Sequence, residues 1–216
     1  MMPSRLKECY WEWRDPYPYR SYFKKRRCIF IHIPKCAGTS VLSSLSDGGV
    51  FYRDHATWLD YKLANPKRYQ AYYKFAFVRN PWDRLVSTYH YLASGGNKTT
   101  DLWLQEIMKQ EGVDFRKFIM QFITADMMHT WLLLKPQHAF VCNYKNEIEV
   151  DFLGRFETIG TDFGQVSTRL NIHGNLPKIN QSHRAKYQDL YTDTGLVDRV
   201  YDLYGKDIDL FGYSFD

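Results

Sequence analysis

A lysine, a glycine and two hydroxyl residues within residues 34–40 (PKCAGTS) have the types and the spacing to bind a phosphate or sulfate group. Lys35 carries a full positive charge, and Gly38 lets an anion approach the backbone closely. The hydroxyl groups of Thr39 and Ser40 can donate hydrogen bonds to the same anion. The stretch therefore predicts an anion site formed by Lys35, Cys36, Ala37, Gly38, Thr39 and Ser40.

The residues on either side predict the elements that position this site. Residues 28–33 (CIFIHI) form an apolar run that is typical of a short buried strand, and Pro34 ends it. After Gly38, apolar side chains recur on one face of a predicted helix. The first N–H groups of a helix lack intrahelical partners and lie at the positive end of its dipole. Strand, loop and helix together therefore favour an anion.

A second stretch, residues 73–92, repeats the order of strand and helix. Residues 75–78 (FAFV) predict a buried strand that ends at Arg79, and open α/β sheets bind ligands at that end of their strands. Ser87 lies two turns into the following helix, near enough to share an anion with Arg79. Three signals mark the start of this helix, namely an N-cap residue, a proline at the first helical position and a carboxylate that can reach back to the cap: Asn80, Pro81 and Asp83.

Together, the segments IFIHIPKCAGTSV and FAFVRNPWDRLVSTYHYL resemble the carbohydrate sulfotransferases that use 3′-phosphoadenosine 5′-phosphosulfate (PAPS). The branch they resemble contains the heparan sulfate 2-O-sulfotransferases and their bacterial relatives. The resemblance continues through DFLGRFETI and LPKINQS to DIDLFGYSF. It implies an α/β fold, a P-loop-like three-layer sandwich with a central, mainly parallel sheet flanked by helices. We expect one domain over residues 1–216, with residues 1–27 as an N-terminal extension.

The resemblance also implies roles for individual residues. In that family the first motif binds the 5′-phosphosulfate of the donor and the second motif binds its 3′-phosphate. Lys35 would neutralise charge on the transferring group, whereas Arg79 and Ser87 would hold the 3′-phosphate. A later loop, residues 176–186, folds over the 3′-phosphate and the adenine in relatives. Its candidate donor-binding residues are Lys178, Ser182, Arg184 and Lys186.

His55 is the predicted general base. A hydroxyl that attacks sulfur loses its proton as the new S–O bond forms, and histidine accepts protons near neutral pH. His55 follows a short strand predicted at residues 50–52, on the side where the donor is expected, and it aligns with the proposed base of the resembling family. Asp54 is expected to cap a helix there.

Composition sets wider bounds. The chain has 216 residues and a net charge of +5, which suits an anionic donor or acceptor. Its four cysteines lack the spacing of zinc ligands, so we expect no metal and no disulfide framework. No apolar run reaches the roughly 18 residues of a membrane span, and there is no signal-peptide core. Golgi members of the resembling family carry a membrane anchor, and this chain is expected to work in the cytoplasm.

Other predicted elements are less closely tied to the site. Apolar faces predict helices within residues 100–134, with Asp114 as an N-cap. Further strands are expected at residues 137–141 and 149–156. Two last helices are predicted, one capped at Thr161-Asp162 and running to Asn171, and one over residues 194–204.

The predicted reaction is in-line transfer of a sulfuryl group from PAPS to a hydroxyl of a carbohydrate, and the acceptor can be acidic. No role in nucleic-acid binding is expected. A P-loop kinase or nucleotidase is one alternative, but Lys35 precedes Gly38, whereas the triphosphatase pattern places its lysine after the last glycine. A non-catalytic polyanion-binding module is the other. The sequence does not name the acceptor sugar.

Overall fold

The structure is a computed structural model that describes residues 16–99, 101–173, 176–177 and 186–216. The chain divides into two compact units. We call the first the sheet unit; it contains the described residues of 1–33, 37–78 and 139–179. The second, the helical unit, contains those of 34–36, 79–138 and 180–216. The predicted donor-binding residues Lys178, Ser182 and Arg184 lie outside the described residues.

The sheet unit is built on three parallel strands in the order β1-β2-β3. The strands are β1 (Cys28–Ile31), β2 (Tyr73–Val78) and β3 (Phe152–Arg155). All four residues of β1 and the last four of β2 are buried. Continuous apolar runs of this kind are expected of parallel strands that are covered on both faces. The strands predicted around residues 28–33 and 75–78 are therefore confirmed.

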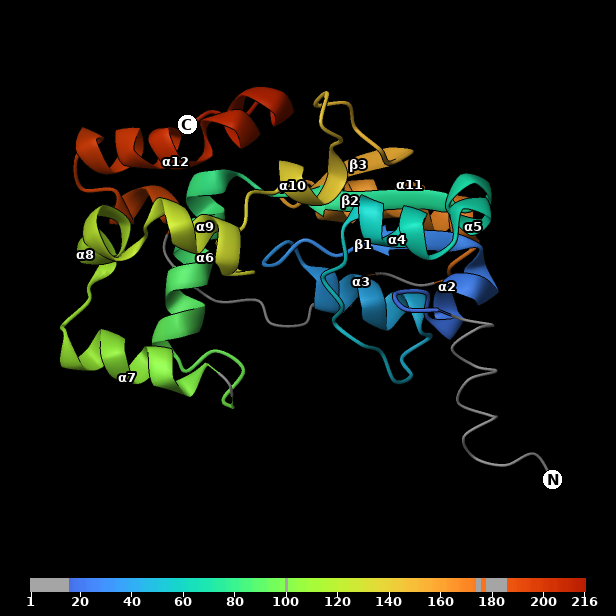
Figure 1. Ribbon diagram of the computed structural model, residues 1–216, viewed down its shortest axis with the longest axis horizontal. Helices are drawn as coiled ribbons and strands as arrows, with labels where there is room; N and C mark the ends of the chain where they lie inside the picture. Colours follow the sequence, from blue (N-terminus) through green and yellow to red (C-terminus); the bar gives the residue numbers. More distant parts are fainter. Residues whose placement is uncertain (1–15, 100, 174–175, 178–185) are drawn as a thin grey trace. The chain divides into compact units, whose positions relative to one another are not determined.

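Helices flank this sheet, so the predicted α/β class and P-loop-like sandwich are confirmed (Figure 1). α11 packs on β3, and α2 packs on β1. The buried Tyr61 of α4 donates from its hydroxyl to the carbonyl of Phe30 in β1, at 3.5 Å. The helices of the unit are α2 (Ser21–Arg26), α3 (Gly38–Leu45), α4 (Trp58–Ala64), α5 (Pro66–Ala71) and α11 (Ile159–Leu170).

The helical unit has a core of its own. Apolar side chains of α6 and α12 meet those of a π-helical turn, among them Val86, Phe118 and Val200, each fully buried. Its helices are α6 (Pro81–Ala93), α7 (Leu102–Gln110), α8 (Phe115–Lys117), the π-helix η1 (Phe118–Phe122), α9 (Ala125–Thr130), the 3₁₀-helix η2 (Tyr187–Leu190) and α12 (Thr194–Phe211). α10 (His138–Val141) begins at His138, the last residue of the 79–138 segment of the helical unit, and its other residues belong to the sheet unit.

Two predicted strands are wrong. Residues 50–52 have no regular secondary structure, and residues 137–141 contain α10 instead of a strand. The helix expected to be capped by Asp54 begins later, at Trp58, because Thr57 and Asp60 form a capping box there. Asp54 instead binds Arg20 through both carboxylate oxygens, at 2.6 and 2.8 Å.

Two predicted helices have different ends. α11 begins at Ile159, before the predicted cap, because Asp162 accepts from the backbone N–H of Arg155 and lies in the first turn of the helix. α12 runs seven residues past the predicted end at 204, to Phe211. Tyr204 marks a kink within it, and the apolar face continues beyond the kink. None of the helices formed by the described residues is long and apolar enough to cross a membrane.

Candidate active site

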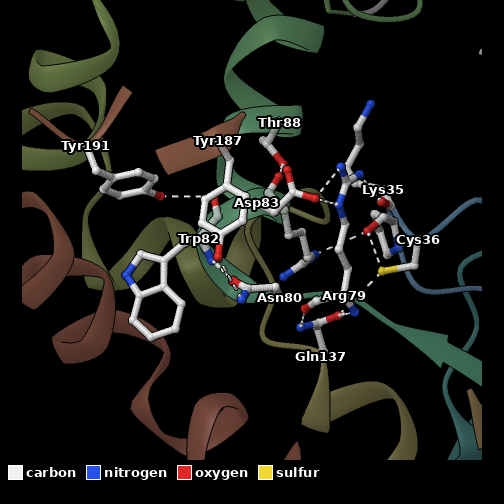
Figure 2. Close-up of polar contacts among 12 residues, drawn as sticks. Lys35, Cys36, Arg79, Asn80, Trp82, Asp83, Thr88, Gln137, Tyr187 and Tyr191 are labelled. Carbon is white, nitrogen blue, oxygen red and sulfur yellow. Dashed lines mark hydrogen bonds and ion pairs between the residues drawn. The ribbon is translucent and has the colours of Figure 1, made fainter. Parts of the chain in front are cut away.

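In the helical unit, two arginines hold the backbone of the loop at residues 34–36. Arg84 of α6 donates from Nε to the carbonyl of Pro34 at 3.2 Å. Arg79 donates from Nη1 to the carbonyl of Lys35 at 2.9 Å (Figure 2). Lys35 has a φ of 68°, in the left-handed region that costs a residue with a side chain about 1–2 kcal/mol. The two arginines therefore stabilise a loop conformation that is unfavourable on its own.

Gln137 links this loop to the backbone of Arg79. Its Oε1 accepts from the N–H of Arg79 at 2.9 Å, and its Nε2 donates to the carbonyl of Arg79 at 2.8 Å (Figure 2). The Cys36 thiol lies 3.4 Å from the same Oε1. Asp207, fully buried, accepts from the N–H of Gln137 at 2.7 Å. The side chain of Gln137 thus pairs with a backbone as a neighbouring strand would, although residues 137–141 form no strand.

Cys36 points into the protein. Its side chain is 1 % exposed, and its thiol also lies 3.6 Å from the carbonyl of Pro34. This position matches the role of a small residue that fits the loop. Any contact of Cys36 with a ligand would therefore involve its backbone.

The charge of Arg79 is already matched inside the helical unit. Asp83 accepts from its Nε and its Nη2, both at 2.7 Å, and the Arg79 side chain is only 6 % exposed. Asp83 lies in the first turn of α6, and its Oδ2 binds this buried guanidinium, so whether it also reaches back to the cap stays a prediction. The cap itself is confirmed: the Asn80 side chain accepts from the N–H of Trp82 at 3.0 Å. Ser87 is partly buried on the same helix.

In the sheet unit, α3 begins without a side-chain cap. Its N-cap residue is Ala37, which is in the left-handed region at φ 59° and ψ 19°. The N–H groups of Ser40 and Val41 bind the Ala37 carbonyl, at 3.0 and 3.3 Å. Gly38 and Thr39 therefore carry the leading N–H groups of the helix, where an anion is favoured. The Thr39 side chain is partly exposed, whereas Ser40 is buried.

Gly38 is a glycine for a reason that the sequence does not reveal. A Cβ at this position would lie 1.8 Å from Nε2 of His32, far inside contact distance. The His32 ring is 5 % exposed and lies against the Gly38 backbone, so no side chain fits there. The sequence predicts a glycine here because a phosphate must approach the backbone. The described residues show another reason, namely that the His32 ring packs against Gly38.

His55 is held by the backbone of His32. Its Nδ1 lies 2.8 Å from the carbonyl of His32, and because a carbonyl only accepts, Nδ1 carries the proton. In the neutral ring the lone pair is then on Nε2. The two imidazole rings are 4.1 Å apart, centre to centre. Burial, followed by the charges of His55 and Arg53, holds the pKa of His32 well below 6.5, so His32 is neutral.

Sequence reasoning assigns no site contact to His32, Arg84 and Gln137. Each looks structural in the sequence: a histidine inside a predicted strand, a second arginine on an amphipathic helix, and a glutamine in an apolar run. Their roles come from contacts with residues 23 to 58 positions away, which local patterns do not record. The described part of the chain contains no group of three or more His, Cys, Asp or Glu side chains placed to hold a metal ion.

A three-stranded parallel sheet, with helix α3 starting without a side-chain cap after the first strand, defines an α/β protein. A profile of the sulfotransferase family matches residues 22–214, so the chain belongs to that family and transfers sulfuryl groups. An uncharacterized protein of Archaeoglobus fulgidus is 25 % identical over 135 residues, which cover 62 % of this chain and 97 % of that protein. No solved structure matches the chain.

Proposed function

We propose that this sulfotransferase moves the sulfuryl group of PAPS to a hydroxyl of a carbohydrate by in-line transfer. The observation that carries the proposal is the hydrogen bond from Arg79 to the carbonyl of Lys35, at 2.9 Å. This bond connects Arg79 of the second predicted motif to Lys35 of the first, and both residues belong to the helical unit. The use of PAPS is general in the sulfotransferase family. The carbohydrate acceptor rests on the resemblance of residues 28–46 and 73–92 to carbohydrate sulfotransferases.

Lys35 is the residue proposed to act on the transferring group. An S–O bond to the acceptor forms while the S–O bond to the phosphate of the donor breaks, and negative charge grows on the leaving phosphate. By analogy with phosphoryl transfer, positioned cations supply most of the stabilisation in such a reaction. Lys35 is partly exposed, and its backbone is fixed by Arg79, so its ammonium can meet that charge.

Backbone and side-chain donors are proposed to hold the two ends of the donor. The leading N–H groups of α3, at Gly38 and Thr39, suit the 5′-phosphate, together with the hydroxyls of Thr39 and Ser40. Arg79 and Ser87 are proposed for the 3′-phosphate. A phosphate at Arg79 competes with Asp83, which already takes two of its N–H groups. Lys178, Ser182 and Arg184 remain candidates for the same end of the donor.

His55 is proposed to accept the proton of the acceptor hydroxyl at Nε2. The carbonyl of His32 keeps the proton of the neutral ring on Nδ1, which leaves Nε2 basic. The neutral form is the active one, so activity should rise with pH through the pKa of His55. His55→Ala should lower kcat by about a hundredfold and remove this acidic limb, because a general base contributes about that much. A retained limb would exclude His55 as the base.

The melting temperature with different ligands tests the function as a whole, because a ligand that binds only the folded state stabilises it. We expect 3′-phosphoadenosine 5′-phosphate (PAP), the product of the donor, to raise Tm without Mg²⁺. A rise with ATP that requires Mg²⁺ would indicate a kinase, and a rise with heparin alone would indicate a polyanion binder. Transfer of labelled sulfate from PAPS to a panel of glycans then identifies the acceptor.

A further inference from the structure

The side chain of Lys35 lies against an aromatic ring. Its Nζ is 4.1 Å from the centre of the Tyr91 ring, well within the distance of about 6 Å at which a ring face attracts a cation. Tyr91 lies on α6, the helix whose Arg84 and whose preceding Arg79 bind the loop carbonyls. Backbone and side chain of Lys35 are therefore both positioned by residues at or near this helix.

The Tyr91 ring is itself anchored. Its hydroxyl donates to Oδ2 of Asp101 at 3.1 Å, and the same oxygen accepts from the N–H of Asn97 at 3.0 Å. The Asn97 side chain accepts in turn from the N–H of Asp101, at 3.1 Å. Gly96, at φ 58°, brings the loop so close that a Cβ there would lie 2.3 Å from the Asp101 side chain. The ring is thus fixed at both ends, by α6 and by the loop that follows it.

We propose that Tyr91 is a positioning residue that holds the Lys35 ammonium for sulfuryl transfer; the role rests on the proposed function. A lysine side chain has four rotatable bonds, and fixing it costs rotamer entropy. An aromatic face limits these rotamers without cancelling the positive charge, as a carboxylate would. The ring contact therefore limits the positions of the Lys35 ammonium, and the contact itself leaves the lysine cationic.

The contact can be tested without any assay of activity. Reductive methylation of Lys35 by formaldehyde and cyanoborohydride, followed by peptide mass spectrometry, measures how strongly the ring shields the amine. Tyr91→Leu should raise the rate of Lys35 methylation about twofold to fivefold, the weight of one exposed cation–π contact. Tyr91→Phe keeps the ring and should leave the rate within twofold of the original protein.

The chain offers a matched control in the sheet unit. Nζ of Lys145 lies 5.8 Å from the centre of the Tyr144 ring, and Tyr144 is 87 % exposed. Tyr144→Leu makes the same chemical change at a lysine with no proposed role. It should alter methylation of Lys145 alone, and it should leave Lys35 and sulfate transfer unchanged.

Kinetics test the positioning itself. Tyr91→Leu should lower kcat about fivefold to tenfold with an unchanged KM for the donor and a retained rise of Tm with PAP, whereas Tyr91→Phe should restore kcat. Unchanged methylation or unchanged kcat in Tyr91→Leu, with PAP still raising Tm, overturns the inference alone. The same kcat loss in Tyr91→Phe assigns the effect to the hydroxyl and overturns a role for the ring. A failure of PAP to raise Tm of the original protein overturns the proposed function and, with it, this role in transfer.

Discussion

The starts of α3 and α6 use opposite solutions to the same problem. Each helix begins with N–H groups that lack intrahelical partners. At α6 the Asn80 side chain accepts from the N–H of Trp82, and Pro81 removes one donor altogether. At α3 the N-cap is Ala37, which has no side chain that can accept, and its backbone is in the left-handed region. The start of α6 is capped by a side chain of its own N-cap residue, whereas the start of α3 has no side-chain cap.

The difference shows which contacts offset the backbone strain of the loop before α3. Lys35 and Ala37 both have positive φ, at 68° and 59°, although neither is glycine. Contacts elsewhere must offset this strain, and in the helical unit Arg79 and Arg84 do so at the carbonyls of residues 34 and 35. The start of α6 is stabilised by a local cap, whereas the loop before α3 depends on residues distant in the sequence.

The largest expected effect is at the loop lysine before α3. Lys35→Ala should lower kcat about a hundredfold to a thousandfold, the usual loss when a donor to a developing negative charge is removed. Lys35→Arg is the control, because it keeps the charge in a different shape. Steady-state kinetics with PAPS measure both variants. A raised donor KM with unchanged kcat would show that Lys35 contributes binding only.

A side chain at Gly38 should disrupt the start of α3. Gly38→Ala places a Cβ 1.8 Å from Nε2 of His32, and overpacking of this severity should lower the free energy of unfolding by about 3 kcal/mol. Chemical denaturation measures the loss. Gly164→Ala in α11 is the control; its Cβ would have no neighbour within 4 Å, so about 1 kcal/mol of stabilisation is expected. The double variant with His32→Ala should recover part of the loss, and no recovery would refute the clash.

The proposed binding of the 3′-phosphate at the start of α6 can be tested by substituting either member of the Arg79–Asp83 ion pair. Arg79→Ala should weaken PAP about tenfold or more while hardly affecting adenosine 5′-phosphosulfate, which lacks the 3′-phosphate, because charged hydrogen bonds are the stronger ones. Asp83→Asn should tighten PAP, because it removes the competing carboxylate at 2.7 Å. Calorimetric titration gives both affinities. Equal losses for the two nucleotides in Arg79→Ala would move Arg79 out of this role.

Acid should destabilise the start of α3 through His32. The pKa of His32 is held well below 6.5 in the folded chain, so the unfolded chain binds more protons below that pH. The neutral His32 ring therefore contributes its full stability above pH 6.5. Below that pH the free energy of unfolding should fall, by at most about 1.4 kcal/mol per pH unit. Denaturation at several pH values should show a shallower slope for His32→Phe, which has no titrating ring. Identical slopes would contradict a titrating His32.

The smallest expected effects are at the N-cap residues of α3 and α6, where substitutions should change stability in opposite directions. Ala37→Gly relieves a left-handed alanine and should stabilise the fold by about 0.5–1 kcal/mol after the entropy of glycine is counted. Asn80→Ala removes an N-cap and should destabilise it by about 1 kcal/mol. Thermal unfolding compares them. The comparison fails if both variants shift Tm in the same direction.

Two strands of the sheet and the start of α6 could be predicted from local sequence patterns. The apolar runs at residues 28–33 and 75–78 predict strands because parallel strands are buried on both faces. Asn80 followed by proline predicts the start of α6 because capping is a local code. The two motifs indicate a sulfotransferase, and the profile match over residues 22–214 confirms the sulfotransferase family, whereas the carbohydrate branch stays a prediction.

Two of the wrong predictions share a physical cause. Asp54 looks like a cap, but its carboxylate binds the half-buried Arg20 instead. Gln137 lies in an apolar run that looks like a strand, yet its side-chain amide forms the backbone pairing. In both cases, Asp54 with Arg20 and Gln137 with Arg79, a polar partner distant in the sequence outweighs a local preference, and a single sequence does not show which partners meet.

The contact between Gly38 and His32 has a consequence for how this chain can change over evolutionary time. Any side chain at position 38 collides with the imidazole, whether or not the loop binds a ligand. A larger residue there is therefore accessible only after position 32 has become small, so the two substitutions are tolerated in one order and not in the other. As long as position 32 is a histidine, substitutions of Gly38 are therefore selected against because of packing alone.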